Sequence, residues 1–458
     1  MGTNWLPDLS NAGRSKYKAL ANAIRDGVAV GDLRSGEKLL PVRELAYQLS
    51  VTPGTVARAY SVLTEEGVLS AGVGRGTFVA ETTTRSDPSY DWPQILSLRS
   101  PLLPDMGQGE LIRDAMRKTA DTIGARDLLS YPTRAMDLPL RRALRRWMSD
   151  LPVGAFTAEE LVLTHGAQNA LLMVMQTVLK GPDPVIAVEE LTYTGFRRAA
   201  ALCNARAVAV RTDEEGPVVA DLERLVREEG VQLFCTSSEV SNPTVRFTSA
   251  RRRQEVAQLA RRLGLHIVDD DCYSIGNHQA ESYYSLLPER GWYVSSLSKA
   301  LTPALRVGYV VPPKEYVADL ERTAHFNSFG LSPVLSDLAL HFMEDPRMLT
   351  VAAKVRARIS ELVRTAVNHL GAYDLSWNED VPLLWLRLPE GWRTASFLHA
   401  AESSGVLLRS AEDFALRDGR APHAVRIAVN GMVDQERFEA GILRLAELLD
   451  NPQEEIGV

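Results

Sequence analysis

Residues 295–308 read Ser-Ser-Leu-Ser-Lys-Ala-Leu-Thr-Pro-Ala-Leu-Arg-Val-Gly, and they place one lysine, Lys299, at the end of an apolar strand pattern. Two hydroxyls, Ser296 and Ser298, flank this amine, and Arg306 follows seven positions later. A primary amine condenses with an aldehyde, and hydroxyls beside a guanidinium bind a phosphate dianion. The segment therefore predicts a site for a ligand that carries both groups, as pyridoxal 5'-phosphate (PLP) does.

The chain around this segment predicts a mostly parallel sheet. From about residue 108, apolar strand patterns alternate with amphipathic helices, which is typical of a parallel sheet covered by helices. Because ligands collect at the carboxyl ends of such strands, polar motifs after the strands are expected to meet in one pocket. The predicted strands are Leu161–Thr164, Pro184–Val188, Ala205–Val210, Val231–Thr236, His266–Asp271, Trp292–Ser298 and Arg306–Val311.

Two short motifs after these strands suit the phosphate and the ring of PLP. Gly166 and Ala167 open a helix that runs to about Leu179, so their free amides can bind phosphate with the helix dipole behind them. Asn242, in Ser-Asn-Pro-Thr, could reach the phenolic oxygen of PLP, although Asn-Pro is also a common turn.

A third motif crowds three carboxylates, Asp269, Asp270 and Asp271, at a strand end. Such a cluster needs a cation, a helix cap or solvent. A protonated pyridine nitrogen is a suitable cation, and Asp270 with Tyr273 is the pair that we expect to hold the ring.

These residues together resemble the fold-type I PLP enzymes, specifically the class I aminotransferases, over residues 108–447. The resemblance implies an α/β fold with a large, mostly parallel sheet domain and a small C-terminal α+β domain at about 340–447. It implies Lys299 as the internal aldimine and Asp270 under the pyridine nitrogen. It further implies Tyr273 and Asn242 on O3', Tyr193 stacked on the ring, and Gly166, Ala167, Ser296, Ser298 and Arg306 on the phosphate.

The same resemblance assigns two residues outside these motifs and has two departures. Tyr131 matches the tyrosine that reaches the phosphate of the neighbouring subunit, and Arg426 matches the arginine that grips an amino acid's α-carboxylate by a bidentate fork. Val245 stands where a glycine usually follows Asn-Pro-Thr, and residues 135–136 replace another usual glycine. Both departures are expected to affect ligand choice rather than PLP binding.

Residues 1–80 predict a separate winged helix-turn-helix domain. A helix at 14–28 and a helix at 44–50 precede a turn at Val51, where Thr52 can cap the next helix and Pro53 suits its first position. This second helix of the motif runs to about Glu66, and residues 68–80 predict two strands around a glycine-rich tip. In such domains the second helix of the motif enters the major groove of DNA, and flanking groups bind the phosphates. The predicted DNA-binding residues are Arg43, Thr52, Gly54, Thr55, Arg58 and Arg75.

This domain resembles the GntR family of bacterial regulators over residues 14–80. The match rests on Arg43-Glu44-Leu45-Ala46, Thr55-Val56, Ala59-Tyr60, Glu66-Gly67 and Gly74-Arg75-Gly76-Thr77-Phe78-Val79. Leu40 replaces a usual proline, and Pro53 replaces an arginine that often contacts DNA. DNA affinity is therefore expected to depend on Arg43, Arg58 and Arg75.

Composition limits the remaining possibilities. Net charge is −7 over 458 residues, but residues 1–80 carry nine Lys/Arg against seven Asp/Glu. The charge of this segment is therefore compatible with DNA binding but does not by itself indicate it. No apolar run approaches the roughly 20 residues of a membrane span, and the N-terminus does not resemble a signal peptide, so we expect a cytoplasmic protein. Three dispersed cysteines predict neither a disulfide framework nor a metal site. Residues 81–107 are expected to form a linker, and 448–458 a C-terminal tail.

A GntR-like domain before an aminotransferase-like domain resembles the MocR/GabR subfamily. The resemblance implies a homodimeric, PLP-requiring transcription regulator that binds operator DNA and senses an amine or amino acid through an external aldimine, without full turnover. Two alternatives stay open: an active class I aminotransferase with an accessory DNA-binding domain, and a PLP-sensing scaffold without a small effector. The sequence does not identify the effector, the operator or the direction of regulation.

Overall fold

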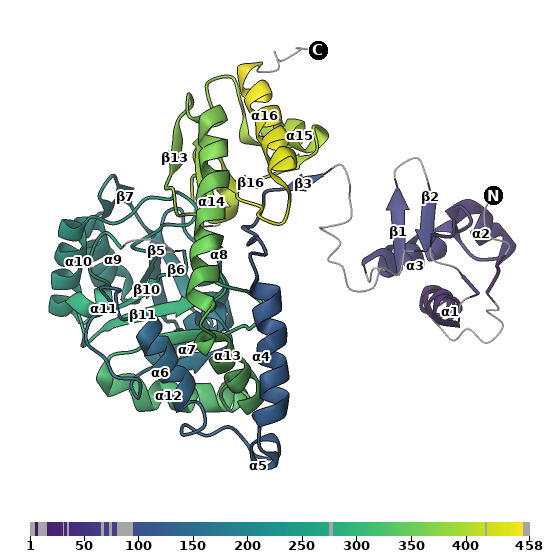
Figure 1. The fold of residues 1–458 in the computed structure, drawn as a ribbon. Helices are drawn as coiled ribbons and strands as arrows, with labels where there is room; N and C mark the ends of the chain where they lie inside the picture. Colours follow the sequence, from purple (N-terminus) through teal and green to yellow (C-terminus); the bar gives the residue numbers. More distant parts are fainter. Residues whose placement is uncertain are drawn as a thin grey trace. The chain divides into compact units, whose positions relative to one another are not determined.

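The computed structural model divides the chain into two compact units (Figure 1), which we call the head (Met1–Pro93) and the body (Gln94–Val458). It describes residues 5–7, 16–30, 32–33, 36–65, 68–72, 76–79, 95–273, 278–416 and 419–451. No helix among these residues is both long and apolar enough to cross a membrane.

The head has the predicted winged helix-turn-helix. The apolar positions Leu20, Ile24, Val56, Ala59 and Leu63 are fully buried in one cluster, as the helical spacing predicts. The backbone N–H of Thr55 donates to the Thr52 hydroxyl at 3.3 Å, which confirms the predicted N-cap. The elements are α1 (Lys16–Val30), α2 (Val42–Gln48), α3 (Pro53–Glu65), and the antiparallel strands β1 (Leu69–Gly72) and β2 (Gly76–Val79).

The body contains a seven-stranded sheet made of the seven predicted strands. Its order is β4-β12-β11-β10-β9-β5-β6, with β12 antiparallel to both neighbours and the other pairs parallel. The inner strands β5, β9, β10 and β11 are buried on both faces, which explains their continuous apolar pattern, whereas the edge strand β6 is partly exposed. Their bounds are β4 (Val162–Thr164), β5 (Val185–Glu189), β6 (Arg206–Val210), β9 (Val231–Thr236), β10 (His266–Asp270), β11 (Gly291–Ser296) and β12 (Gly308–Val311).

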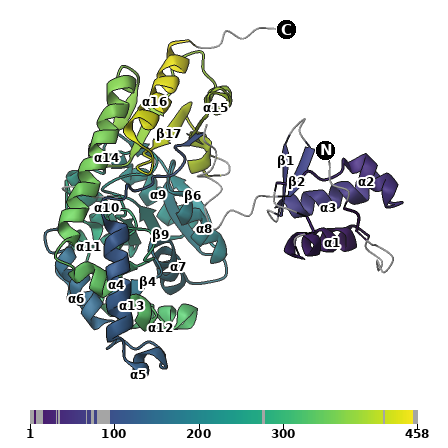
Figure 2. The ribbon, with the colours of Figure 1, turned by 45° about the vertical axis from the view of Figure 1, so that its right-hand side comes forward.

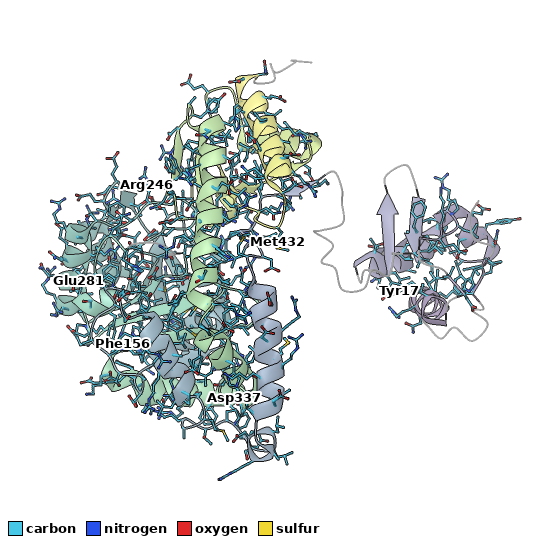
Figure 3. All side chains as sticks on the ribbon, viewed as in Figure 1. Tyr17, Phe156, Arg246, Glu281, Asp337 and Met432 are labelled. Atoms are coloured by element: carbon cyan, nitrogen blue, oxygen red, sulfur yellow. The ribbon has the colours of Figure 1, made fainter. Side chains whose placement is uncertain are left out.

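Helices cover both faces of this sheet, and their side chains fill the space against it (Figure 3). One face packs against α7 (Ala167–Val178), α8 (Thr194–Leu202) and α12 (Val317–Ser328). The other packs against α9 (Val219–Glu229), α10 (Ala250–Leu263) and α11 (Tyr283–Leu286), and against α4 (Gln108–Thr122), α6 (Leu138–Trp147) and α13 (Pro333–Glu344). Minor elements are α5 (Ala125–Leu128), β7 (Thr212–Asp213), β8 (Gly216–Pro217) and the 3-10 helix η1 (Lys314–Tyr316).

A smaller four-stranded sheet follows in the C-terminal part, in the order β13-β14-β17-β16. One of its faces packs on α14 and α16, which lie side by side in Figure 2. The elements are α14 (Met348–Leu370), β13 (Leu375–Trp377), β14 (Leu383–Arg387), α15 (Thr394–Ser403), β15 (Val406–Leu407), β16 (Arg409–Ser410), the 3-10 helix η2 (Ala411–Phe414), β17 (Ala424–Ala428) and α16 (Gln435–Asp450).

Two predicted boundaries of the body were wrong. The linker was expected to reach residue 107, but β3 (Leu96–Ser97) pairs with β15 and its neighbour Leu98 is fully buried in the core. The tail was expected from 448, but α16 continues to Asp450 and buries Leu449. The linker was predicted from a polar, proline-rich composition. Composition does not show which few apolar residues pair with a strand that is distant in the sequence, so the prediction failed at β3.

Candidate functional site

Several of the predicted site residues of the body lie at the carboxyl edge of the large sheet. Asp270 ends β10, Lys299 follows β11, and Asn242 lies in the loop after β9. Gly166 is the residue before α7, two positions after the end of β4. The parallel strands bring these residues to one edge although they are up to 133 positions apart in the sequence.

The three consecutive carboxylates have different environments. Asp269 accepts from the Ser238 backbone N–H at 3.0 Å and from the Ser238 hydroxyl, and Asp271 accepts from His278 at 2.6 Å and the Tyr293 hydroxyl at 2.7 Å. These contacts are made within the protein and tie neighbouring loops and strands together. Asp269 and Asp271 are therefore held by partners within the protein, which leaves Asp270 as the candidate for binding the ring nitrogen.

Asp270 is a buried carboxylate with incomplete hydrogen bonding. Its Oδ1 has no partner among the described residues, as is also true of the second oxygen of Asp271. Burial raises the pKa of Asp270 to about 7, against a weaker opposing contribution from its hydrogen bond with the Cys272 thiol. A cationic ring nitrogen would supply the missing donor and the missing positive charge, so this residue fits the expected PLP ring.

Lys299 lies beside the predicted ring partners. Its Nζ is 5.9 Å from the centroid of the Tyr273 ring, and Tyr273 accepts from the Asn242 amide at 3.4 Å. Burial lowers the pKa of Lys299, and the positive charges of Arg426 and Arg306 lower it further. A larger fraction of the amine is then neutral and able to attack an aldehyde.

The turn between β4 and α7 forms a close contact with Arg306. Gly166 has φ of +81°, and a Cβ atom there would lie 2.7 Å from the Arg306 guanidinium. A Cβ at Gly308 would lie 2.5 Å from the Gly166 backbone, so glycine is required on both sides. The guanidinium thus lies against the N-terminus of α7, where a phosphate would meet both. Ser296 and Ser298 are buried in the same segment, and the Ser298 N–H donates to the Ser296 hydroxyl at 3.4 Å.

Tyr193 is positioned by a residue to which the sequence assigned no role. Its hydroxyl donates to Gln168 Oε1 at 3.0 Å, and the Gln168 amide donates to the Gly195 carbonyl at 3.1 Å. Burial raises the pKa of Tyr193 to about 12, which keeps it a neutral donor. The signal for Gln168 was its position in the first turn of the helix that Gly166 and Ala167 open.

Arg426 is a buried guanidinium on β17 that is held by neutral oxygens. It donates to Asn242 Oδ1 at 2.8 Å and to the Arg99 carbonyl, while its Nε has no partner among the described residues. Its guanidinium lies 4.7 Å from the centre of the Phe414 ring. Burial lowers its pKa to about 10. Such a group favours an incoming carboxylate, because an unpaired buried charge is costly. Arg99 and Phe414 had no signal in the sequence.

Two other predicted positions behave differently. Val245, where the resemblance has glycine, adopts φ of +60°, a left-handed conformation that is strained for a β-branched residue. Tyr131 does not enter the site of its own chain. It is 73% exposed and stacks on Phe329, with ring centroids 4.9 Å apart.

In the head, the N-terminal part of α3 presents an exposed polar surface. Thr52, Gly54 and Arg58 are exposed, Thr55 is half-buried, and Arg43 is exposed on α2. The Arg58 guanidinium lies 4.6 Å from the centre of the Tyr17 ring, a residue of α1 labelled in Figure 3. Arg75, expected at the wing tip, lies outside the described residues. Among the described residues no group of three or more His, Cys, Asp or Glu side chains could hold a metal ion.

Comparison with protein families assigns both units. Residues 93–443 match the family described as aminotransferase class I and II, and residues 16–79 match the bacterial regulatory proteins of the gntR family.

Individual relatives include regulators and enzymes. The uncharacterized HTH-type transcriptional regulator YdeF of Bacillus subtilis is 26% identical over 98% of this chain and 97% of its own length. The 2-aminoadipate transaminase of Thermus thermophilus is also 26% identical, over 82% of this chain and 96% of its own. The kynurenine aminotransferase of Pyrococcus horikoshii, whose structure was solved with PMP, superposes with a TM-score of 0.69 at 22% identity, over 79% of this chain and 92% of that one.

Proposed function

Because the chain belongs to the class I and II aminotransferases and carries a gntR-family domain at its N-terminus, we propose that it is a transcription regulator. It binds operator DNA through the head and responds to an amine or amino acid bound in the body. The observation that carries this proposal is the presence of both sites in one chain: an exposed polar surface on α3, and buried charges in the body arranged for a small ligand.

PLP is the cofactor of the body. When bound, it supplies an aldehyde carbon that condenses reversibly with primary amines. Asp270 would hold the ring nitrogen, Tyr273 and Asn242 the phenolic oxygen, and Tyr193 the ring face. The phosphate would be held by Gly166, Ala167, Ser296, Ser298 and Arg306. The unpartnered Oδ1 of Asp270 and the contact between Arg306 and the Gly166 turn support this assignment.

The effector is an amine or an amino acid whose amino group would compete with Lys299 Nζ for the aldehyde of the cofactor. Arg426 binds its carboxylate by a bidentate fork, since the guanidinium is buried and its present acceptors are neutral. Lys299 Nζ, once released, is free to move or to hold a proton. Binding changes DNA affinity only if the two conformations of the protein bind the effector differently, by typically about 1–3 kcal/mol.

The active form is a homodimer in the cytoplasm. Exposed apolar side chains support a second copy as partner, because isolated proteins rarely expose contiguous apolar surface. Tyr131 and Phe329 are exposed and stack on each other, and we group with them the exposed Leu128, Leu129 and Phe326, which are close to them in the sequence, as the exposed apolar patch. In this arrangement Tyr131 completes the phosphate site of the other subunit.

An active aminotransferase is the second candidate. The lowered pKa of Lys299 favours it, because a neutral amine can take a proton from a substrate carbon. We propose half-transamination at most. Steady turnover with a keto-acid acceptor at roughly 1 s⁻¹ or above would establish the enzyme instead.

The decisive experiment is a footprint on DNA upstream of the protein's own gene, with PLP present, across a panel of amines and amino acids. Visible absorbance of bound PLP is recorded in parallel. A compound that shifts both signals identifies the effector of a regulator. Lys299→Ala is expected to abolish the absorbance response and to retain DNA protection. If the DNA is not protected and bound PLP cycles steadily to its amine form, the proposal is overturned.

A further inference from the structure

A second arginine lies beside Arg426 in the small sheet. β16 and β17 are antiparallel, and Arg409 is the direct partner of Arg426 in their register. Directly opposed residues project from the same face of a sheet, with Cβ atoms only about 4.5–5.5 Å apart. Because the opposite face of the sheet packs on α14 and α16, both arginines project toward the large sheet and the ligand site.

Phe414 supports both guanidiniums. The carbon of the Arg426 guanidinium is 4.7 Å from the ring centroid and that of Arg409 is 5.9 Å away. Two cations are therefore held near one aromatic ring by adjacent strands. The Arg409 charge also contributes to lowering the pKa of Arg426, after the larger effect of burial.

The ion pair between Arg409 and its acidic partner is weak. Its Nε is 3.9 Å from Asp413 Oδ2, too far for a hydrogen bond, and both side chains are partly exposed. An ion pair of this kind contributes little to the free energy of unfolding. The Arg409 side chain is 32% exposed, so a ligand can still reach it.

Like charges directly opposite each other destabilise a pair of strands. The repulsion between Arg409 and Arg426 is relieved if each guanidinium binds an anion when the site is occupied. One carboxylate would neutralise Arg426 and leave Arg409 with its distant partner. A ligand with two carboxylates would satisfy both.

We propose that the effector is a dicarboxylic amino acid, whose α-carboxylate binds Arg426 and whose side-chain carboxylate binds Arg409. This inference rests on the proposed function for the assignment of Arg426. Arg99 is a nearby alternative for the side-chain carboxylate, because its Nε donates to the Leu408 carbonyl at 3.4 Å.

The test titrates the full-length, PLP-loaded protein with L-glutamate and with its neutral counterpart L-glutamine, and follows the absorbance of bound PLP. Glutamate is expected to bind at least about tenfold more tightly, as one charge-assisted contact allows. Arg409→Gln is expected to remove this preference by weakening glutamate binding about tenfold, with glutamine binding changed less than about twofold.

The matched control is Arg387→Gln. Arg387 lies on β14 with its side chain on the same face as Arg409, and pairs with Asp374 at 3.8 Å. This variant removes the same charge from the sheet and is expected to keep the preference for glutamate.

Three results would overturn the inference: equal binding of glutamate and glutamine, equal loss of both ligands in Arg409→Gln, or loss of the preference in Arg387→Gln or Arg99→Gln instead. Footprinting distinguishes a failure of the proposed function. If glutamate binds through Arg409 and DNA protection is absent or unchanged, the assignment of the ligand stands and the regulatory function does not.

Discussion

At the scale of single residues, the buried carboxyl group of Asp270 links the stability of the protein to pH. In the folded, cofactor-free protein its pKa is raised from 3.8 to about 7. Between these values the folded state keeps a proton that the unfolded state has lost, so folding takes up a proton. Stability contributed at Asp270 is therefore present below about pH 4 and is lost as pH rises toward 7.

Asp270→Asn is expected to raise the melting temperature of the cofactor-free protein at pH 8 by about 2–4 °C, because no charge is then buried. At pH 5 the gain is expected to be smaller. PLP affinity is expected to fall at both pH values, since the partner of the ring nitrogen is lost. Calorimetry with and without PLP measures this, and exposed Asp183→Asn is the control. A gain that does not depend on pH would contradict the assignment.

Val245 also belongs at the residue scale. Its φ of +60° is a conformation that glycine adopts without strain, which fits the glycine expected here from the resemblance to class I aminotransferases. The sequence marked the departure, and the structure shows that the chain keeps the glycine conformation with a valine.

At the scale of elements, the turn from β4 into α7 needs glycine because Arg306 occupies the space of a side chain. Gly166→Ala is expected to displace Arg306 and to weaken PLP binding at least about tenfold, roughly 1.4 kcal/mol. Absorbance titration with PLP measures the change.

Gly181→Ala is the matched control for this turn, because Gly181 also has positive φ, +87°, but nothing lies within 4 Å of its added Cβ. It bears the same backbone strain without the contact. Equal loss of PLP affinity in the two variants would show that strain, rather than the position of Arg306, is responsible.

The helix α3 gives a second prediction at this scale. Arg58 packs on Tyr17, which pre-organises its guanidinium beside the exposed N-terminal part of the helix. Arg58→Ala is expected to weaken DNA binding and to reduce the slope of log affinity against log salt by about 1, as for one lost phosphate contact. Binding at several salt concentrations measures the slope. An unchanged slope would remove Arg58 from the interface.

At the scale of the whole molecule, the exposed apolar patch predicts the dimer. Leu129 is 88% exposed and precedes Tyr131 by two residues in the sequence. Leu129→Lys is expected to shift the protein toward monomer and to weaken PLP binding, because Tyr131 no longer reaches the other subunit. Sedimentation velocity and PLP titration test this together.

Leu202→Lys is the control for this prediction, because Leu202 is 72% exposed at the end of α8 and lies outside the patch. A dimer that persists in Leu129→Lys, or a monomer in Leu202→Lys, would contradict the assignment of the interface.

The sequence by itself determined the class of each unit. Strand and helix periodicity depend on local spacing, so the seven strands and the helices of the head were predictable, as was the Thr52 cap. That the residues of the three motifs lie at one edge was also predictable, since each motif follows a strand and such strands end at one edge; their roles stay predictions.

Only the tertiary structure decided which partners these residues have. It showed that Asp269 and Asp271 are held by Ser238 and Tyr293, and it placed β3 in the body and Arg409 beside Arg426. These outcomes depend on pairing between segments that are distant in the chain. Local sequence patterns do not encode such contacts, because their energy comes from packing and burial rather than from local propensity.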